Sequence, residues 1–181
     1  FIKLIQGHYK NIIYILGNHE YYNNNEENVG VILDYLIPKN LRLVFKYREF
    51  CKTHGIIFLE NEFVNIDGIK IGGTTLWSPV TKNASLRMND QIFISQKDVL
   101  EINEKALDWI VENSIENIDI MITHHLPSHR FVSERFANYD NTGFANNSLD
   151  MYFKELPIDY WIFGHTHTPM SENFCGIQFI C

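Results

Sequence analysis

The chain has 181 residues, of which 45% are hydrophobic, 14% aromatic and 20% charged. This composition excludes a disordered segment, and the length suits one domain, residues 1–181, with a substantial core. The formal net charge of -7 argues against the broad basic surface that a nuclease needs to bind nucleic-acid backbone.

The cysteines and the lengths of the apolar runs predict the cellular compartment of the protein. Cys51, Cys175 and Cys181 form no C-x-x-C pair, so we expect free thiols in a reducing, cytoplasmic setting. The apolar runs fall far short of the roughly 18 residues that a membrane span needs. The chain opens on Phe1 with no Met and no signal peptide, which predicts a fragment or a trimmed chain.

The first half of the chain mixes short strands with helices. The Asn-rich stretch from Tyr22 to Asn28 is typical of a solvated loop or a helix start. Apolar residues at helical spacing predict helices over 29–37 and 41–51, separated at Pro38. Strands are predicted at 12–16, 56–59, 63–66 and 69–72, the last three as one meander with a tight turn at Asp67-Gly68.

The second half contains one long helix and three more strands. Ser95 and Asp98 resemble a capping box at the start of a helix over 95–110. The polar loop over 128–147 is long enough to suggest a functional element. A short helix is predicted over 148–154, and strands are predicted at 118–123, 159–163 and 176–180.

Five of the chain's eight histidines follow the ends of three predicted strands. In open α/β sheets the carboxyl ends of adjacent strands meet at one ligand site, so we expect the loops after 12–16, 118–123 and 159–163 to converge. Separate packing or surface histidines are the alternative, but they do not explain the clustering. The histidines concerned are His19, His124, His125, His165 and His167.

The side chains of these loops have the chemistry of metal ligands. Neutral imidazole nitrogens with a carboxamide oxygen form a borderline-hard site suited to Mn, Fe or Zn. Structural zinc normally completes its coordination with Cys, so a hydrolytic site is favoured over a structural one. The predicted donors are Asn18, His124, His165 and His167.

Three blocks of the chain resemble, in order and spacing, the later signature blocks of the calcineurin-like metallophosphoesterases. They are Gly17-Asn18-His19-Glu20, Thr123-His124-His125-Leu126-Pro127 and Gly164-His165-Thr166-His167, and the Met88-Asn89-Asp90 segment resembles an uncharacterised branch. The resemblance implies an α/β fold, a four-layer α/β/β/α sandwich with two divalent metal ions at the strand ends. It also implies that a hydroxide bridging ions about 3.5–4 Å apart attacks a phosphate mono- or diester.

The resemblance also implies residue roles by motif position. Asn18, His124 and His165 would bind one metal, and His167 would bind the other. His19 would stay off the metals and protonate or stabilise the leaving oxygen.

Other residues near the three motifs are candidates for supporting the metal ligands or for binding the substrate. Glu20 would orient His19 or a metal ligand, or it would serve as a carboxylate at a helix N-terminus. Arg130 and Arg135 in the long loop could meet a substrate phosphate. His125, Asn89 and Asp90 would either support the metal ligands from behind or line the substrate cleft, with a surface or packing role as the alternative. Tyr21 and His129 are further candidates for the cleft, with the same alternative.

The chain departs from the family pattern at its start. The earlier blocks, Asp-x-His and Gly-Asp-x-x-Asp, have no counterpart, and no aspartate precedes Gly17. We expect truncation rather than loss of these blocks, and we expect the isolated chain to bind metal weakly and to hydrolyse poorly. The leading hypothesis is a metal-dependent phosphoesterase acting on a phosphorylated small molecule, nucleotide or protein. The alternative is an inactive relative that serves as a binding or scaffold domain.

Overall fold

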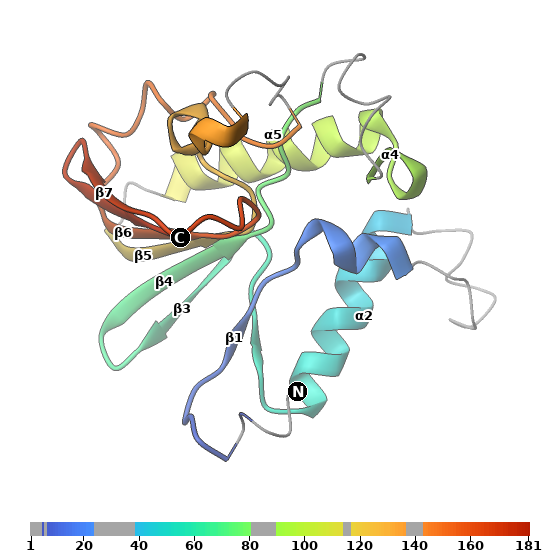
Figure 1. Cartoon of the computed structure of the whole chain (residues 1–181). Helices are drawn as coiled ribbons and strands as arrows, with labels where there is room; N and C mark the ends of the chain where they lie inside the picture. The colour runs from blue at the N-terminus through green and yellow to red at the C-terminus, as the bar shows by residue number, and fades with distance from the viewer. Residues whose placement is uncertain (1–4, 6, 24–38, 81–89, 114–116, 137–142) are drawn as a thin grey trace.

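A computed structural model of the chain describes residues 5, 7–23, 39–80, 90–113, 117–136 and 143–181 (Figure 1). The helix predicted over 29–37 and most of the Asn-rich stretch lie outside these residues. No helix in the described part of the chain is long and apolar enough to span a membrane.

Most predicted elements form, with shifts at their ends. The strands are β1 (Ile13–Tyr14), β2 (Ile57–Phe58), β3 (Glu62–Ile66), β4 (Ile69–Thr74), β5 (Ile118–Thr123), β6 (Ile158–Phe163), β7 (Ser171–Phe174) and β8 (Ile177–Ile180). The helices are η1 (Asn18–Asn23), α2 (Lys39–Thr53), α4 (Asp90–Phe93), α5 (Gln96–Asn113), η2 (His129–Phe131) and η3 (Glu134–Phe136), where η marks a 3-10 helix. The sequence does not predict β7, because most of its residues are polar and no local apolar pattern marks it.

Two sheets run through the fold (Figure 1). The small sheet pairs β1 with β2 in parallel, and the large sheet has the order β3-β4-β5-β6-β8-β7. Strands β4, β5, β6 and β8 are parallel, whereas the edge strands β3 and β7 are antiparallel to their neighbours. The carboxyl ends of the parallel strands therefore lie at one edge of the sheet, where ligands bind in folds of this kind.

The expected three-stranded meander is wrong. β2 pairs with β1 in the small sheet, and only β3 and β4 form a hairpin, which turns at Asp67 and Gly68 with φ of 53° and 92°. Positive φ at both central residues is what a type I′ turn needs, so the predicted turn is confirmed. Asn61, with φ of 55°, lies between β2 and β3, where the chain passes from one sheet to the other.

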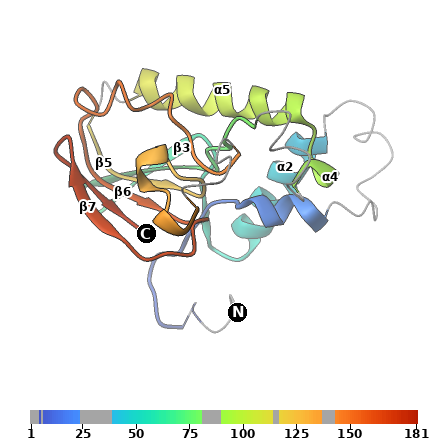
Figure 2. The ribbon, with the colours of Figure 1, turned by 45° about the horizontal axis from the view of Figure 1, so that its top comes forward.

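Two adjacent glycines in β4 show how the layers stack. A Cβ at Gly72 would lie 3.2 Å from the Trp109 ring of α5, and a Cβ at Gly73 would lie 2.7 Å from Leu59 and 3.0 Å from Ile15, next to the small sheet. Successive strand residues face opposite sides, so α5 covers one face of the large sheet and the small sheet lies against the other. Helix α2 packs on the small sheet (Figures 1 and 2). The predicted α/β/β/α order is confirmed.

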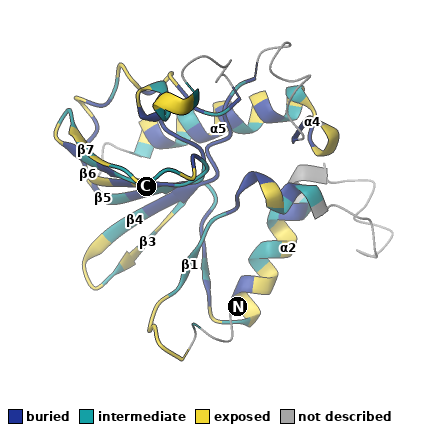
Figure 3. Cartoon of the chain, in the orientation of Figure 1, coloured by how far each residue is buried: buried dark blue, intermediate teal, exposed yellow. Residues whose placement is uncertain are grey.

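The largest core lies between α5 and the large sheet. Ala106 and Ile110 of α5 are fully buried there with Phe153, Trp161 and Phe179. Figure 3 shows buried and exposed bands alternating along α5, as expected for a helix with one apolar face. Edge-to-face contacts join Phe153 to Trp161 and to Phe179, so aromatic packing fixes the sheet and the segment around Phe153 to one another.

Ser148 to Lys154 is not the predicted short helix. The segment forms successive turns, with hydrogen bonds from Tyr152 N to Leu149 O and from Glu155 N to Tyr152 O. These turns bury Leu149 and Phe153 in the core. Packing of those two side chains, rather than helical propensity, therefore decides the local backbone.

Candidate functional site

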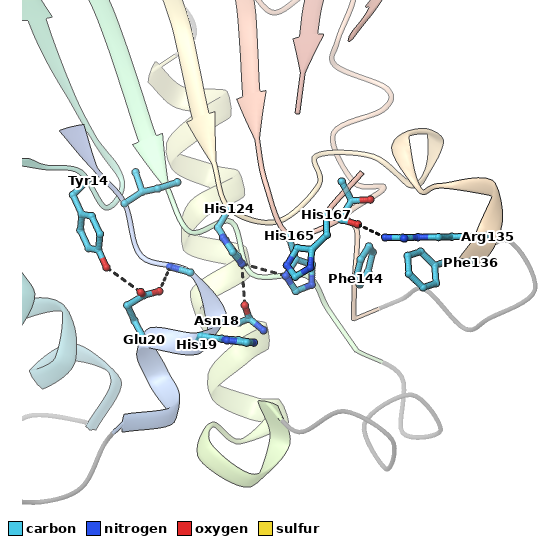
Figure 4. A pocket seen from close by; sticks show the side chains of 13 residues that line it. Tyr14, Asn18, His19, Glu20, His124, Arg135, Phe136, Phe144, His165 and His167 are labelled. Atoms are coloured by element: carbon cyan, nitrogen blue, oxygen red, sulfur yellow. Dashed lines mark hydrogen bonds between the residues drawn. The ribbon is translucent and has the colours of Figure 1, made fainter. Parts of the chain in front are cut away.

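The three histidine-bearing loops meet beside the carboxyl ends of β1, β5 and β6 (Figure 4). Parallel pairing places Thr123 of β5 opposite Phe163 of β6, so the residues that follow both strands emerge side by side. A 3.1 Å hydrogen bond from Gly164 N to His124 O continues this pairing into the loops. Asn18 enters from η1, which follows β1.

Two atoms that could bind a metal ion lie close to one imidazole nitrogen of His124. His124 Nε2 lies 2.9 Å from Asn18 Oδ1 and 3.2 Å from His165 Nδ1. The two pairs are separated by 106 and 41 positions in the sequence, so only the tertiary fold brings them together. The structure thus gathers a carboxamide oxygen and two imidazoles at one point.

The loop after β6 has an unusual backbone. His165 and His167 have φ of 66° and 51°, in the left-handed region that non-glycine residues rarely adopt, although His is enriched there. A 2.7 Å hydrogen bond from Thr166 N to Gly164 O supports the turn between them. Both histidines line the same pocket. Backbone strain of this kind concentrates at functional sites.

The convergence opens into a pocket of about 530 Å³ (Figure 4). Tyr14 and Glu20 lie at one end of the pocket and Arg135, Phe136 and Phe144 at the other, with the histidines between them. The ring centroids of Phe144 and His165 lie 4.5 Å apart. The lining includes His19, His124, His165, His167, Arg135, Phe136 and Phe144.

The two arginines of the long loop have different surroundings. Arg135 lines the pocket, where its Nη2 donates to Thr166 O at 3.1 Å and its guanidinium lies 4.5 Å from the ring centre of Phe136. Arg130 pairs with Glu172 at 2.6 Å and is not part of the pocket lining. Of the two, only Arg135 is placed to meet a substrate.

Burial keeps three imidazoles at the site neutral, those of His124, His125 and His165. It lowers the pKa of His124 to about 4 and the pKa of His165 to about 3, and for His165 the neighbouring His124 adds to the shift. Burial also holds the pKa of His125 well below its usual value. A neutral imidazole keeps a lone pair available to a metal ion.

Glu20 supports the turn that carries Asn18. Its carboxylate accepts hydrogen bonds from Gly17 N at 2.7 Å and from Tyr14 Oη at 3.0 Å. Burial, followed by the charge of Glu20, raises the pKa of Tyr14, so the phenol remains a donor. No hydrogen bond joins Glu20 to His19 among the residues that the structure describes. Glu20 is thus a carboxylate at the start of η1, and through Gly17 N it also supports the turn that carries the predicted ligand Asn18.

His125 lies behind the pocket and does not line it. Its buried ring packs between Trp77, at a centroid distance of 4.9 Å, and His165, at 4.3 Å. Its Nδ1 lies 3.4 Å from Thr75 O. Packing against Trp77 therefore keeps His125 out of the cleft that we expected it to line, and the pocket lining also lacks Tyr21 and His129.

The two remaining candidates come from the segment before α5. Asp90 is 5% exposed and hydrogen-bonds to Asn18 from outside the pocket lining. It is not among the residues that line the pocket, and its Oδ1 is turned to Asn18 and Tyr22 instead. Asn89 lies outside the described residues.

The profile of the calcineurin-like phosphoesterases matches residues 1–169. The chain belongs to this family. It is 30% identical to an uncharacterised protein of Acanthamoeba polyphaga mimivirus over 203 aligned positions, covering 98% of this chain and 69% of that protein. The phosphopantetheinyl hydrolase of Mycobacterium tuberculosis has the same fold, with a TM-score of 0.66 and 14% identity over 99% of this chain and 71% of that one. A putative 5′-nucleotidase from Staphylococcus aureus aligns at a TM-score of 0.46 and 16% identity, over 99% and 33% of the two chains.

Calcineurin-like phosphoesterases generally use divalent metal ions, and the donor atoms here fit such an ion. Ligand bonds of about 2.1 Å place neighbouring ligand atoms about 3 Å apart, close to the 2.9 and 3.2 Å around His124 Nε2. His165 Nε2 is buried with no hydrogen-bond partner in the described part of the chain. That part contains no metal-binding group of three or more His, Cys, Asp or Glu side chains, and the third donor here is the Asn18 carboxamide.

Sequence reasoning missed three residues around this candidate site. Phe136 and Phe144 line the pocket, but they lie in a stretch with no periodicity, which left no local signal. Gly17 is a close-packing position, because a Cβ there would lie 2.8 Å from His124 Cε1 and 3.0 Å from Glu20 Oε2. A glycine directly before a predicted ligand was the available signal for that close approach.

Replacing Gly17 by alanine is expected to weaken metal binding by about tenfold, a loss typical of displacing groups that orient a ligand. The new methyl group would push the His124 ring away from Asn18. Calorimetric titration with Mn²⁺ measures the effect. The matched control is Gly164→Ala, because a Cβ at Gly164 would meet nothing closer than 3.8 Å. Equal affinities in the two variants would contradict this role for Gly17.

A second prediction concerns Glu60, which accepts hydrogen bonds from Thr75 N at 3.1 Å and Thr75 Oγ1 at 2.6 Å. Burial raises the pKa of Glu60 from 4.5 to about 7. The folded state therefore holds this proton more tightly than the unfolded state, so its stabilising effect is present below pH 4.5 and is lost as pH rises through about 7. Between pH 5 and 8 we expect the wild type to lose on the order of 2 kcal/mol of unfolding free energy relative to Glu60→Gln.

Urea denaturation of both metal-free proteins at several pH values measures this difference. The histidines affect both proteins equally and cancel in the comparison. Parallel pH profiles for the two proteins would show that Glu60 does not titrate in this window.

Proposed function

We propose that this calcineurin-like phosphoesterase hydrolyses a phosphate mono- or diester with two divalent metal ions, Mn, Fe or Zn. Asn18, His124 and His165 would hold one ion, and His167 would hold the other. The observation that supports this most strongly is the approach of Asn18 Oδ1 and His165 Nδ1 to His124 Nε2, at 2.9 and 3.2 Å. When bound, such ions supply a Lewis acid and an activated water.

His19 is the residue to which we assign the proton at the leaving oxygen. It lines the pocket and is exposed, so a bound ester can reach it. Its ring stacks on Tyr22 at a centroid distance of 4.6 Å, which holds its plane. An imidazole placed at the leaving oxygen donates a proton, or stabilises the negative charge, as the ester bond breaks.

The other end of the pocket is the proposed place for the rest of the substrate. Arg135 is the sole Lys or Arg among the described lining residues, and its charge would attract a phosphate group. The rings of Phe136 and Phe144, 5.7 Å apart, offer an apolar surface to the organic part. A phosphorylated small molecule, a nucleotide or a phosphorylated protein segment has these two kinds of group.

Hydrolysis of generic esters by the full-length protein tests the proposal. Para-nitrophenyl phosphate reports monoesterase activity and bis-para-nitrophenyl phosphate reports diesterase activity, each with and without added Mn²⁺. We expect turnover that depends on Mn²⁺ and that a chelator abolishes. Turnover that a chelator leaves unchanged would overturn the proposal.

A second candidate function, a binding or scaffold domain without turnover, has one observation in its favour. Among the described lining residues Glu20 is the sole carboxylate, and both of its oxygens are occupied, by Tyr14 and by Gly17 N. No described carboxylate is therefore placed to bridge two ions. Binding of Mn²⁺ by the full-length protein without hydrolysis of either ester would favour this candidate.

A further inference from the structure

A buried carboxylate contacts the proposed metal ligand Asn18 from the side away from the histidines. Asp90 Oδ1 accepts a 2.8 Å hydrogen bond from Asn18 Nδ2 and another of 2.8 Å from Tyr22 Oη. Asp90 is 5% exposed and lies 72 positions from Asn18 in the sequence. A carboxylate buried to this degree needs such donors, so the two bonds fix its position.

The carboxamide of Asn18 carries an oxygen, Oδ1, and an NH₂ group, Nδ2, and the contact with Asp90 decides which of them faces the histidines. With Nδ2 on the Asp90 carboxylate, Oδ1 faces His124 Nε2 at 2.9 Å. In the flipped orientation the amide oxygen would face a carboxylate oxygen, which also only accepts hydrogen bonds. The NH₂ group, which has no lone pair to offer a metal ion, would then face the histidines. Repulsion at Asp90 therefore excludes the orientation that cannot bind metal.

We propose that Asp90 is a positioning residue that holds Asn18 Oδ1 toward the metal site. The inference rests on the proposed function, in which Asn18 is a ligand. Acting through Tyr22, Asp90 also positions His19.

The proposal has two branches: in the first Asp90 orients Asn18, and in the second it positions His19. The second branch depends on a stack of aromatic rings. Tyr22 donates to Asp90, and its ring lies between those of His19 and Phe93, each at a centroid distance of 4.6 Å. Asp90 and Phe93 are the first and last residues of α4, so this short helix supports both the ligand and the proposed acid. The two branches predict separable effects: loss of metal affinity for Asn18, and loss of turnover for His19.

Variants of Asp90 test the first branch by Mn²⁺ titration of the full-length protein. Asp90→Leu removes the acceptor and is expected to lower Mn²⁺ affinity at least about tenfold. Asp90→Asn keeps an oxygen for both donors and is expected to restore most of the affinity. Asp98→Leu is the matched control, because in the described part of the chain Asp98 hydrogen-bonds to Ser95 at the start of α5, away from Asn18. Wild-type affinity in folded Asp90→Leu would overturn the proposal.

The metal-free wild type gives a measurement that no variant's folding can affect. The side-chain NH₂ protons of Asn18, observed by ¹⁵N NMR, are expected to exchange slowly with solvent because one of them is bound to a buried carboxylate. Fast exchange would overturn the positioning role. This result is independent of whether the protein binds metal, so failure of the proposed function and failure of this inference are distinguishable.

Variants of Tyr22 test the second branch. Tyr22→Ala removes the ring beneath His19 and is expected to lower kcat about tenfold or more. It also removes the 3.3 Å hydrogen bond from Asn18 Nδ2 to Tyr22 Oη, but the shorter 2.8 Å bond to Asp90 remains, so Mn²⁺ affinity is expected to fall less than kcat. Tyr22→Phe keeps the stacked ring but lacks the hydroxyl that donates to Asp90, so it is expected to lose part of kcat, less than Tyr22→Ala loses. Equal losses of kcat and Mn²⁺ affinity in Tyr22→Ala would overturn the separation of the two branches.

Discussion

The full-length His124→Ala protein is expected to bind Mn²⁺ at least about 100-fold more weakly than the wild type, because loss of a group that merely orients a ligand already costs 10–100-fold. His124 Nε2 is the atom that both Asn18 Oδ1 and His165 Nδ1 approach, so its removal leaves those two donors without the nitrogen between them. Ester hydrolysis is expected to fall to background in the same variant. Calorimetric titration and a para-nitrophenyl phosphate assay measure the two losses.

A histidine outside the pocket is the control for this prediction. His129 lies in η2 and is not part of the pocket lining, so His129→Ala is expected to retain both metal affinity and turnover. Thermal unfolding of the metal-free proteins checks that each variant is folded. A folded His124→Ala protein with wild-type affinity would remove His124 from the ligand set.

The His19→Ala protein is expected to keep its metal affinity and to lose about 10²- to 10⁴-fold in kcat, the usual contribution of a general acid or base. His19 is exposed in the pocket and stacks on Tyr22, and no hydrogen bond joins it to the three donor atoms among the described contacts. Its imidazole is therefore free to meet the leaving oxygen. His124→Ala is expected to behave differently, because it loses metal affinity, whereas His19→Ala loses kcat and keeps metal affinity.

The leaving group provides the sharper test of His19. An alkyl phosphate has a poor leaving group that needs protonation, whereas para-nitrophenolate leaves readily without it. His19→Ala is expected to lose much more activity on the alkyl ester than on the aryl ester. Equal losses on both esters would show that His19 does not protonate the leaving oxygen, and loss of Mn²⁺ would show that it is a ligand instead.

Local patterns predicted the elements that carry the chemistry. The apolar run at 118–123 forms β5 with the expected bounds, and the run ending at Phe163 forms β6. Nearly continuous apolar runs of this length are typical of strands in the middle of a parallel sheet, and the Gly or His residue that follows each run therefore lies at a strand end. The meander failed, because the choice of partner for β2 depends on contacts with residues more than 40 positions away, which no local pattern contains.

The sequence by itself determined the family and the residues of its signature blocks, because a strand followed by Gly, Asn and His is a property of neighbouring positions. Only the tertiary structure decided what each polar side chain contacts. It placed Arg135 in the pocket and Arg130 outside it, and it placed Asp90 against Asn18. Hydrogen bonds require approach to about 3 Å, and for residues 72 or 106 positions apart that approach is set by packing of whole layers.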